Sequence, residues 1–373
     1  MDFDLVIIGA GVIGLSVGKA LLNRSDNICL IEKRNSYGLE TSSRNSEVIH
    51  SGIYYPKDSL KSKLCIDGNR LLYEYCNDKS IPYDKCGKLI IANDKDGHAR
   101  LLELQRNADL LDIKYSVLNK DQIKEVEPLI KAKYAIQIEN AGIIDSHALM
   151  TSMYNELIES DVSIAFKTEV IAISQISNGY KLDIKNPDKS ESVVSTKVLI
   201  NCAGLYASFI SSLLGLKDNQ YRTQFCKGSY YWINNKKVKD IKSLIYPVPN
   251  QKLYGLGIHT TKGLDGRVKL GPDAEFLGES LQFDYSINTN KKQKYYENCK
   301  EYLPFLELED IEPDFAGIRP KLQKPGENVR DFIIQNEHKK GFNNFINLIG
   351  IESPGLTASL AIGGYVKQSI NWY

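Results

Sequence analysis

Residues 4–14, Asp-Leu-Val-Ile-Ile-Gly-Ala-Gly-Val-Ile-Gly, decide the fold. The first five form a short apolar run that is typical of a buried parallel strand. The glycines at positions 9, 11 and 14 match the pattern Gly-x-Gly-x-x-Gly, which is informative when it lies between a strand and a helix. A helical pattern over Val12–Leu22 and a second apolar strand over Asn27–Glu32 supply that context. The sequence therefore predicts a right-handed βαβ unit that binds a dinucleotide.

Each residue of this turn has a physical role in binding a pyrophosphate. Gly9 permits the tight turn, Gly11 lets the backbone approach the phosphates, and Gly14 lets the helix pack closely on the strand. The free N–H groups of the helix N-terminus then face the negative charge. Glu32 follows Gly14 by eighteen residues, where a carboxylate accepts hydrogen bonds from an adenosine ribose and repels the 2′-phosphate of NADP. The alternative is a glycine-rich turn with a surface glutamate.

Two further segments favour FAD over NAD. Residues 40–46 (ETSSRNS) place small hydroxyl side chains soon after the second strand, where they suit hydrogen bonds to a pyrophosphate. Residues 350–357 (GIESPGLT) form a second glycine-containing turn between a strand and a helix, and that helix N-terminus could face the flavin ring or the ribityl chain. FAD is long enough to need both ends of the chain, so we expect FAD. Taken singly, each segment could equally be a loop with a helix cap.

The bulk composition is that of an ordinary globular protein. The 373 residues exceed what one compact core usually holds, so we expect two domains. The 47 basic and 46 acidic side chains nearly cancel, which argues against a nucleic-acid partner. Seven cysteines without a Cys-x-x-Cys pair predict neither a disulfide framework nor a metal site. The sequence has no Gly-x-Ser-x-Gly motif, so a serine hydrolase is not indicated.

The start of the sequence bears on localisation. The first expected strand begins at about Asp4, which leaves no room for a signal or transit peptide. The longest apolar stretch, Leu5–Val17, is too short to span a bilayer. We therefore expect a cytoplasmic protein without a transmembrane segment. Peripheral contact with the inner membrane stays open.

Hydrophobic periodicity predicts further elements along the chain. Expected helices cover Ser59–Asp78, Ala99–Leu111, Ser146–Ser160 (with Ser146 as the N-cap) and Pro354–Trp372. Expected strands cover Lys88–Ala92, Ile164–Ile173, Tyr180–Ile184, Lys197–Asn201 and Phe342–Ile349, with antiparallel sheet over Gln220–Gly271.

Parallel strands are thus expected at both ends of the chain, with antiparallel sheet between them. The expected fold class is α/β plus α+β, in which a Rossmann-like FAD-binding domain is interleaved with an antiparallel-sheet substrate domain. We expect residues 1–83, 141–218 and 315–373 in the FAD-binding domain, and residues 84–140 and 219–314 in the substrate-binding domain.

Five segments resemble a known group of flavoproteins. They are residues 43–55 (SRNSEVIHSGIYY), 86–90 (CGKLI), 245–249 (IYPVP), 256–259 (LGIH) and 353–362 (SPGLTASLAI). Over essentially its whole length the sequence resembles the L-2-hydroxyglutarate dehydrogenase/oxidase group of the D-amino-acid oxidase-like (DAO) superfamily of FAD-dependent oxidoreductases. The resemblance implies oxidation of a 2-hydroxy acid, with L-2-hydroxyglutarate to 2-oxoglutarate as the first reaction to expect, by hydride transfer to flavin N5.

Two positions depart from the pattern of that group. Lys227 stands before Gly228 where the group often has arginine, and Asp273 follows Pro272 where the group often has asparagine. Because a lysine cannot clamp a carboxylate with two parallel bonds, another hydroxy acid stays open as the substrate. An amino-acid or amine oxidase, a glycerol-3-phosphate dehydrogenase and a flavin-binding protein without turnover also stay open.

Oxidation of a 2-hydroxy acid needs a group that holds the carboxylate and a base that takes the hydroxyl proton. His50 and His259 lie in the resembling segments and are the candidate bases. Arg319 is the candidate carboxylate anchor, and Arg44 could serve likewise or hold the FAD phosphates. Which compound accepts the electrons, whether oxygen, a quinone or a carrier protein, stays open.

The remaining expected site residues fall into two sets. Expected substrate contacts are Tyr54, Tyr55, Lys227, Tyr230 and Tyr246. Expected FAD contacts are Gly9, Ala10, Gly11, Val12, Ile13, Gly14, Glu32, Lys33, Thr41, Ser42, Ser43, Arg44, Asn45, Val170, Ala203, Gly204, Gly317, Gly350, Gly355, Leu356 and Thr357.

Overall fold

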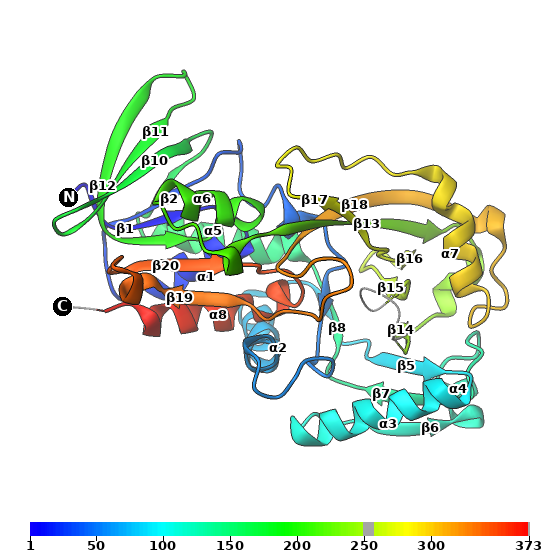
Figure 1. The fold of residues 1–373 in the computed structure, drawn as a ribbon. Coiled ribbons are helices and arrows are strands. Elements are labelled where there is room, and N and C mark those ends of the chain that lie inside the picture. The colour runs from blue at the N-terminus through cyan, green and yellow to red at the C-terminus, as the bar shows by residue number, and fades with distance from the viewer. Residues whose placement is uncertain (249–256, 372–373) are drawn as a thin grey trace.

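The computed structural model describes residues 1–248 and 257–371, and these form two large β-sheets and one small one (Figure 1). Pro249, Leu256 and Trp372, which belong to two of the motifs and to the expected last helix, lie outside the described residues. No helix in the two described ranges is long and apolar enough to cross a membrane.

Parallel strands form the centre of the eight-stranded sheet. Their order is β9 (Ser163–Ala165), β2 (Ile28–Ile31), β1 (Phe3–Ile8), β12 (Glu191–Asn201) and β20 (Phe345–Ile349), followed by the antiparallel β19 (Ile333–Asn336). β2 and β20 are buried along their whole length, which is why they read as continuous apolar runs. The parallel strands end at one edge of the sheet, so the turns that follow β1, β2, β12 and β20 meet there.

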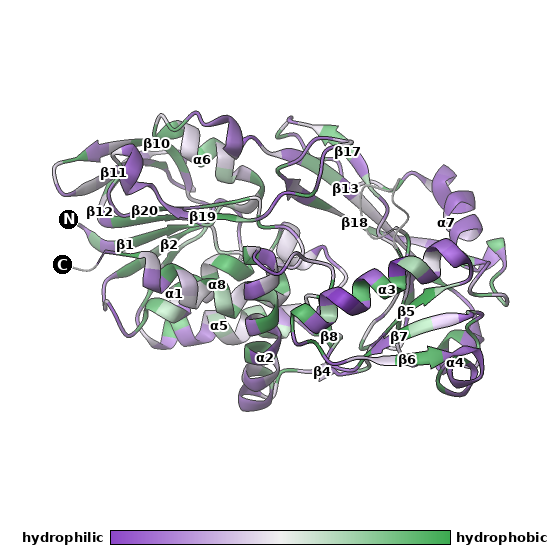
Figure 2. Ribbon diagram, turned by 60° about the horizontal axis from the view of Figure 1, so that its bottom comes forward, coloured by the Kyte–Doolittle hydropathy of each residue, from purple (hydrophilic) through white to green (hydrophobic). Residues whose placement is uncertain are grey.

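The two faces of this sheet are covered differently (Figure 1). On one face α1 (Val12–Leu21) packs against α5 (Ser146–Glu159) and α8 (Gly355–Ser369), and α2 (Leu60–Lys79) packs against α8. On the other face β10 (Glu169–Ile176), β11 (Gly179–Lys185) and the first half of β12 form an antiparallel ribbon beside α6 (Ala207–Leu213). Figure 2 shows the apolar strands of the sheet between these layers.

The nine-stranded sheet is mainly antiparallel. Its strands are β5 (Lys88–Ala92), β6 (Ser116–Asn119), β7 (Tyr134–Ile138), β13 (Gln224–Ile233), β14 (Leu244–Pro247), β15 (Thr260–Lys262), β16 (Val268–Leu270), β17 (Glu275–Gly278) and β18 (Ile311–Lys321). The helices in this part of the chain are α3 (Lys95–Leu110), α4 (Lys120–Val126) and α7 (Lys292–Cys299). The small sheet contains β3 (Val48–Ile49), β8 (Gly142–Ile144) and β4 (Tyr83–Asp84). The expected combination of a parallel α/β sheet with a largely antiparallel one is confirmed.

Two local predictions were wrong. The single strand expected over Ile164–Ile173 is two strands, β9 and β10, because Lys167 between them adopts a left-handed conformation with φ of +54°. Ser146 is the first residue of α5 and not its N-cap. The cap is Asp145, whose Oδ1 accepts a hydrogen bond from the N–H of Ala148 at 2.8 Å.

The second sheet also differs from the prediction. β14 pairs with β5 in parallel, inside a region that was expected to be antiparallel throughout. β18 was not predicted as a strand, yet its eleven residues pair with β13 along most of its length. The expected domain boundary at residue 315 falls within β18.

Gly14 brings α1 onto the turn after β1 so closely that no side chain fits between them. A Cβ atom at position 14 would meet the carbonyl oxygen of Gly9. We expect Gly14→Ala to lower the free energy of unfolding by about 2–3 kcal/mol, because the helix must move away from the strand. Urea unfolding followed by circular dichroism measures the change.

Gly364→Ala on α8 is the matched control. A Cβ atom there meets nothing within 4 Å, so we expect the stability to stay equal or to rise slightly. Equal stability of the two variants would contradict the close approach at Gly14.

Candidate active site

A cavity of about 860 Å³ opens at the edge of the parallel sheet and extends to the second sheet. Most of the predicted site residues line it: Gly9, Gly11, Val12, Ile13, Glu32, Lys33, Thr41, Ser42, Arg44, Asn45, His50, Tyr54, Tyr55, Val170, Ala203, Gly204, Tyr230, Tyr246, His259, Gly317, Arg319, Gly355 and Leu356. Six do not: Ala10, Gly14, Ser43, Lys227, Gly350 and Thr357. The candidate cofactor, base and carboxylate-binding residues therefore share one space.

The glycine-rich turn and Ser42 form one end of this cavity. Gly9 has φ of +103°, and a Cβ atom there would lie 2.5 Å from the carbonyl oxygen of Cys202, so the position requires glycine. The N–H of Val12 donates to Oγ of Ser42 at 3.0 Å, and a Cβ atom at Gly11 would lie 3.0 Å from the same oxygen. A side chain at position 11 would fill the space in front of the helix N-terminus, where a pyrophosphate fits.

Glu32 follows β2, and both of its carboxylate oxygens are held. One oxygen accepts from the N–H of Ala10 at 2.9 Å, and the other accepts from the N–H of Arg34 at 2.7 Å. Ala10 thus orients Glu32 from outside the cavity. Each oxygen keeps a lone pair for a further donor, so the arrangement fits the ribose hydroxyls of FAD.

Tyr206 lines the same end, and sequence reasoning missed it. The ammonium group of Lys33 lies 2.6 Å from the centroid of its ring. Burial lowers the pKa of Lys33 to about 8. No motif marks Tyr206, because it ends a short 3-10 helix after β12 (Gly204–Tyr206) and only the fold brings it to Lys33.

His259 lies at the other end of the cavity, with its ring stacked on Tyr246 at a centroid distance of 3.8 Å. Its Nδ1 is 2.9 Å from the carbonyl oxygen of Gly257. The neutral ring therefore carries its proton on Nδ1 and leaves Nε2 as an acceptor. Burial, together with the charges of Lys88 and Arg319, lowers the pKa of His259 to about 3, so this ring is neutral at ordinary pH.

The backbone of His50 is fixed on both sides. Its N–H donates to Oγ1 of Thr357 at 3.0 Å, and its carbonyl oxygen accepts from the side-chain amide of Asn69 at 3.0 Å. Thr357 therefore supports His50 from behind the cavity wall. Burial, with the charge of Lys88 and the neighbouring His259, holds the pKa of His50 well below its usual range. Both candidate bases are thus in the proton-accepting state.

Arg319 extends from β18 beside Cys226 of β13. Its Nη2 donates to the carbonyl oxygen of Asp273 at 2.6 Å, whereas its Nε is buried without a partner among the described residues. The hydroxyl groups of Tyr54 and Tyr246 also lack a partner there. Buried polar groups without partners are rare, and three of them around one cavity suit a polar ligand.

Lys227 is placed differently from the expectation. Its ammonium group lies 3.4 Å from the carboxylate of Asp284 and away from the cavity lining. The side chain of Lys227 therefore does not face the same space as that of Arg319.

A buried charged triad that sequence reasoning missed lines the cavity near Tyr55. Glu352 accepts from Nζ of Lys61 at 3.1 Å and from Nζ of Lys321 at 2.6 Å, and all three side chains are at most 8% exposed. One signal was available in the sequence. Lys321 follows Arg319 by two residues, so the two side chains share one face if the segment is a strand.

Glu352→Gln should lower the free energy of unfolding by about 3 kcal/mol, because two buried ammonium groups lose their counter-charge. Burial opposes ionisation of this carboxyl, but Lys321 and Lys61 bring its pKa from 4.5 down to about 2. The stabilisation is therefore complete above pH 4.5 and is lost as the pH falls toward 2. Urea unfolding at several pH values measures both effects.

Glu74→Gln is the matched control, since Glu74 pairs with Arg70 on the exposed face of α2. We expect a loss of at most about 0.5 kcal/mol there. Equal losses at positions 352 and 74 would show that the buried triad contributes no more than a surface pair.

Comparisons with known proteins agree with this geometry. A family model described as FAD dependent oxidoreductase (DAO) matches residues 4–369. The chain is 33% identical to the mitochondrial L-2-hydroxyglutarate dehydrogenase of Arabidopsis thaliana, over 98% of this chain and 83% of the plant protein. It is 32% identical to a glycerol 3-phosphate dehydrogenase of Caloramator mitchellensis, over 98% of this chain and 73% of that protein.

A solved structure matches the whole chain. The dithionite-reduced L-α-glycerophosphate oxidase from Mycoplasma pneumoniae with FAD bound superposes with a TM-score of 0.89 at 28% identity, covering 100% of this chain and 95% of the oxidase. The chain therefore belongs to the DAO family of FAD-dependent oxidoreductases.

Proposed function

We propose that this chain oxidises a 2-hydroxy acid with FAD, and that L-2-hydroxyglutarate, converted to 2-oxoglutarate, is its substrate. One observation carries the proposal. Arg319, with an unpartnered buried Nε, lines the same cavity as two neutral histidines and the dinucleotide-binding turn. A guanidinium group binds a carboxylate, and a neutral histidine accepts a hydroxyl proton. The L-2-hydroxyglutarate dehydrogenases among the relatives support this choice of substrate.

Each polar group has a proposed role. Arg319 binds the substrate carboxylate, and either His50 or His259 takes the proton of the C2 hydroxyl through a ring nitrogen. Tyr54 and Tyr246 donate hydrogen bonds that orient the substrate. FAD, when bound, supplies the hydride acceptor.

Glycerol 3-phosphate is a second candidate, because a relative and a solved structure carry that activity in their names. Both compounds combine an oxidisable CH–OH group with an anion, so the pocket chemistry described above suits either. The phosphate of glycerol 3-phosphate carries more negative charge than a single carboxylate. In 2-hydroxyglutarate, one of the two carboxylates is bonded directly to the carbon that is oxidised. An activity comparison separates them.

Anaerobic L-2-hydroxyglutarate should bleach the flavin absorbance of the purified protein. We expect its kcat/KM to exceed those of glycerol 3-phosphate, L-lactate and L-alanine by at least about tenfold, because L-lactate and L-alanine lack its second carboxylate and glycerol 3-phosphate has a phosphate and no carboxylate. Stopped-flow absorbance measures each rate. Faster bleaching by glycerol 3-phosphate would select the second candidate, and no bleaching by any hydroxy acid would refute the proposed substrate class.

Replacement of the base should slow flavin reduction by about 10²- to 10⁴-fold. We expect this loss in one of the variants His50→Gln and His259→Gln, and less than about tenfold in the other. His147→Gln, at an exposed position on α5, is the control. Because both pKa values lie well below 6.5, kcat/KM should show no break near pH 6.5. Small losses in both variants would exclude the base role for either histidine.

A further inference from the structure

The loop between β16 and β17 passes directly beside Arg319. The carbonyl oxygen of Asp273 in this loop accepts from Nη2 of Arg319 at 2.6 Å. The other described partners of Nη2, the carbonyl oxygen of Lys227 and Sγ of Cys226, are both 3.5 Å away. The contact with Asp273 is therefore the one short hydrogen bond in this group, and it sets the direction of the guanidinium plane.

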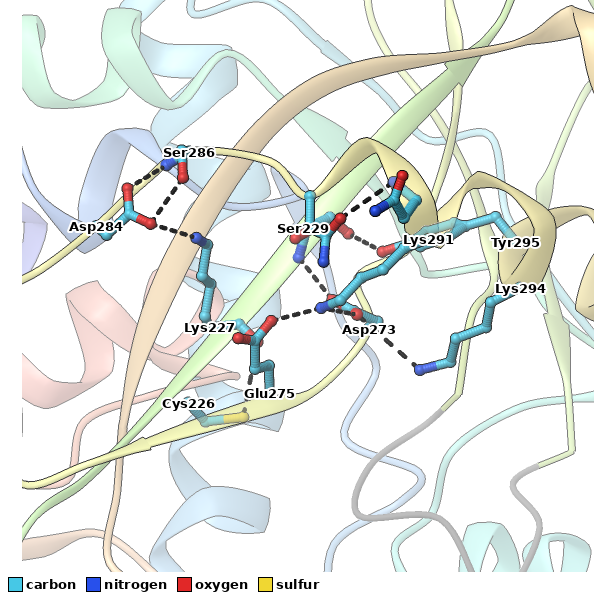
Figure 3. A network of polar contacts seen from close by, with 12 residues as sticks. Cys226, Lys227, Ser229, Asp273, Glu275, Asp284, Ser286, Lys291, Lys294 and Tyr295 are labelled. Carbon is cyan, nitrogen blue, oxygen red and sulfur yellow. Dashed lines mark hydrogen bonds and ion pairs between the residues drawn. The ribbon is translucent and has the colours of Figure 1, made fainter.

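The side chain of Asp273 fixes the same stretch of backbone. Its carboxylate accepts from the N–H of Ser229 at 2.9 Å and pairs with Nζ of Lys291 at 2.9 Å (Figure 3). The side chain of Asp273 is only 1% exposed, so its carboxylate is shielded from water. The hydroxyl of Tyr295 on α7 donates to the carbonyl oxygen of Ser229 at 2.5 Å. The loop is thus tied to β13 and to the start of α7.

The space around the guanidinium group is also tight. A Cβ atom at Gly228 would lie 2.7 Å from Cβ of Pro272 and 3.0 Å from Nη2 of Arg319. Arg319 therefore lies against the backbone of β13 on one side and against the loop on the other. If the loop moved, the guanidinium group would lose its orientation.

This arrangement gives a reason for an aspartate at position 273. An asparagine could accept the Ser229 hydrogen bond through its side-chain carbonyl, but it could not form an ion pair. An aspartate makes both contacts, and the positive charge comes from Lys291 at 2.9 Å and, farther away, from Lys294 at 4.0 Å. Glu275 binds the ammonium group of Lys291 at 2.5 Å but is half exposed and makes no described contact with Arg319.

We propose that Asp273 is a positioning residue: anchored by Ser229 and Lys291, it holds Arg319 in the orientation that binds the anionic group of the substrate. The inference rests on the proposed function, in which Arg319 is that binding group. Asp273 acts through its backbone carbonyl, and its side chain keeps that carbonyl in place.

The test separates binding from chemistry in the FAD-loaded protein. We expect Asp273→Ala to raise KM for L-2-hydroxyglutarate by about tenfold or more, with kcat changed less than about threefold, because a misdirected guanidinium group weakens anion binding. Asp273→Asn keeps the Ser229 bond and should give a smaller rise. Glu275→Gln removes the other carboxylate from Lys291 and should leave KM unchanged.

A double-mutant cycle tests whether Asp273 acts through Arg319. In the Arg319→Ala background, Asp273→Ala should cause no further rise in KM, since the group it orients is gone. An unchanged KM in Asp273→Ala, or additive losses in the cycle, would overturn the inference. If Asp273→Ala does not fold, Asp273→Asn and Lys291→Met are measured in the same cycle. Additive losses with Arg319→Ala in these variants would likewise overturn the inference.

The two proposals fail in different ways. If the unmutated protein is reduced by glycerol 3-phosphate and not by hydroxy acids, the proposed substrate is wrong, and the same cycle is run with glycerol 3-phosphate. If the unmutated protein oxidises L-2-hydroxyglutarate and the cycle is additive, only the positioning role is wrong.

Discussion

The close approach of backbone to backbone at Gly9 is the constraint on which the rest of the site depends. The N–H of Gly9 donates to the carbonyl oxygen of Ile31 at 2.8 Å, and the N–H of Cys202 donates to that of Ile8 at 2.9 Å. These bonds join the carboxyl ends of β1, β2 and β12, and they leave no room for a side chain at position 9. Because the three strand ends meet there, the turns that carry Glu32, Ser42 and Ala203 all reach one cavity.

Positive charge near His259 bears on both proposed roles of this end of the cavity, the binding of an anion and the action of a neutral base. Lys88 is 1% exposed, and its ammonium group lies 4.1 Å from the ring centroid of Tyr246, on which His259 stacks. Burial lowers the pKa of Lys88 to about 8, with no carboxylate beside it among the described residues. Positive charge at Lys88 and Arg319 favours an anionic ligand, and the same charge helps to keep His259 unprotonated. The same positive charges thus attract an anion and disfavour protonation of the base, so the two proposed roles are compatible.

The dinucleotide half of the site could be predicted because local rules govern it. Gly9, Gly11, Gly14 and Glu32 lie within one βαβ unit, and each position follows from the geometry of that unit. Farther along the chain, contacts between distant segments decide which way a side chain points. Thr357 was expected at the cofactor, but its hydroxyl bonds to the backbone of His50.

The substrate half depends on pairings between distant segments, and these leave little trace in a sequence. β18 contains Pro313 and Pro320, and prolines in a sequence indicate a loop more often than a strand. Only the register of β18 with β13 places Arg319 beside Cys226. The triad of Lys61, Glu352 and Lys321 joins α2, β18 and the turn before α8. No periodicity in the sequence connects such positions, so the contacts between them could not be predicted from the sequence.

The position of α8 in the chain has a consequence for biosynthesis. Ser16 of α1 donates from its hydroxyl to the carbonyl oxygen of Ser359 at 2.7 Å, and a Cβ atom at Gly363 would lie 2.6 Å from the carbonyl oxygen of Ser16. On the ribosome, α1 is made well before α8 and β20 and must wait for them, since Ser16 and Ser359 are 343 residues apart in the chain. Until then its apolar face lacks its final cover, and such delayed long-range pairing exposes a nascent chain to misfolding and aggregation. The dinucleotide-binding sheet is therefore complete only after β20, which ends at Ile349, has been translated.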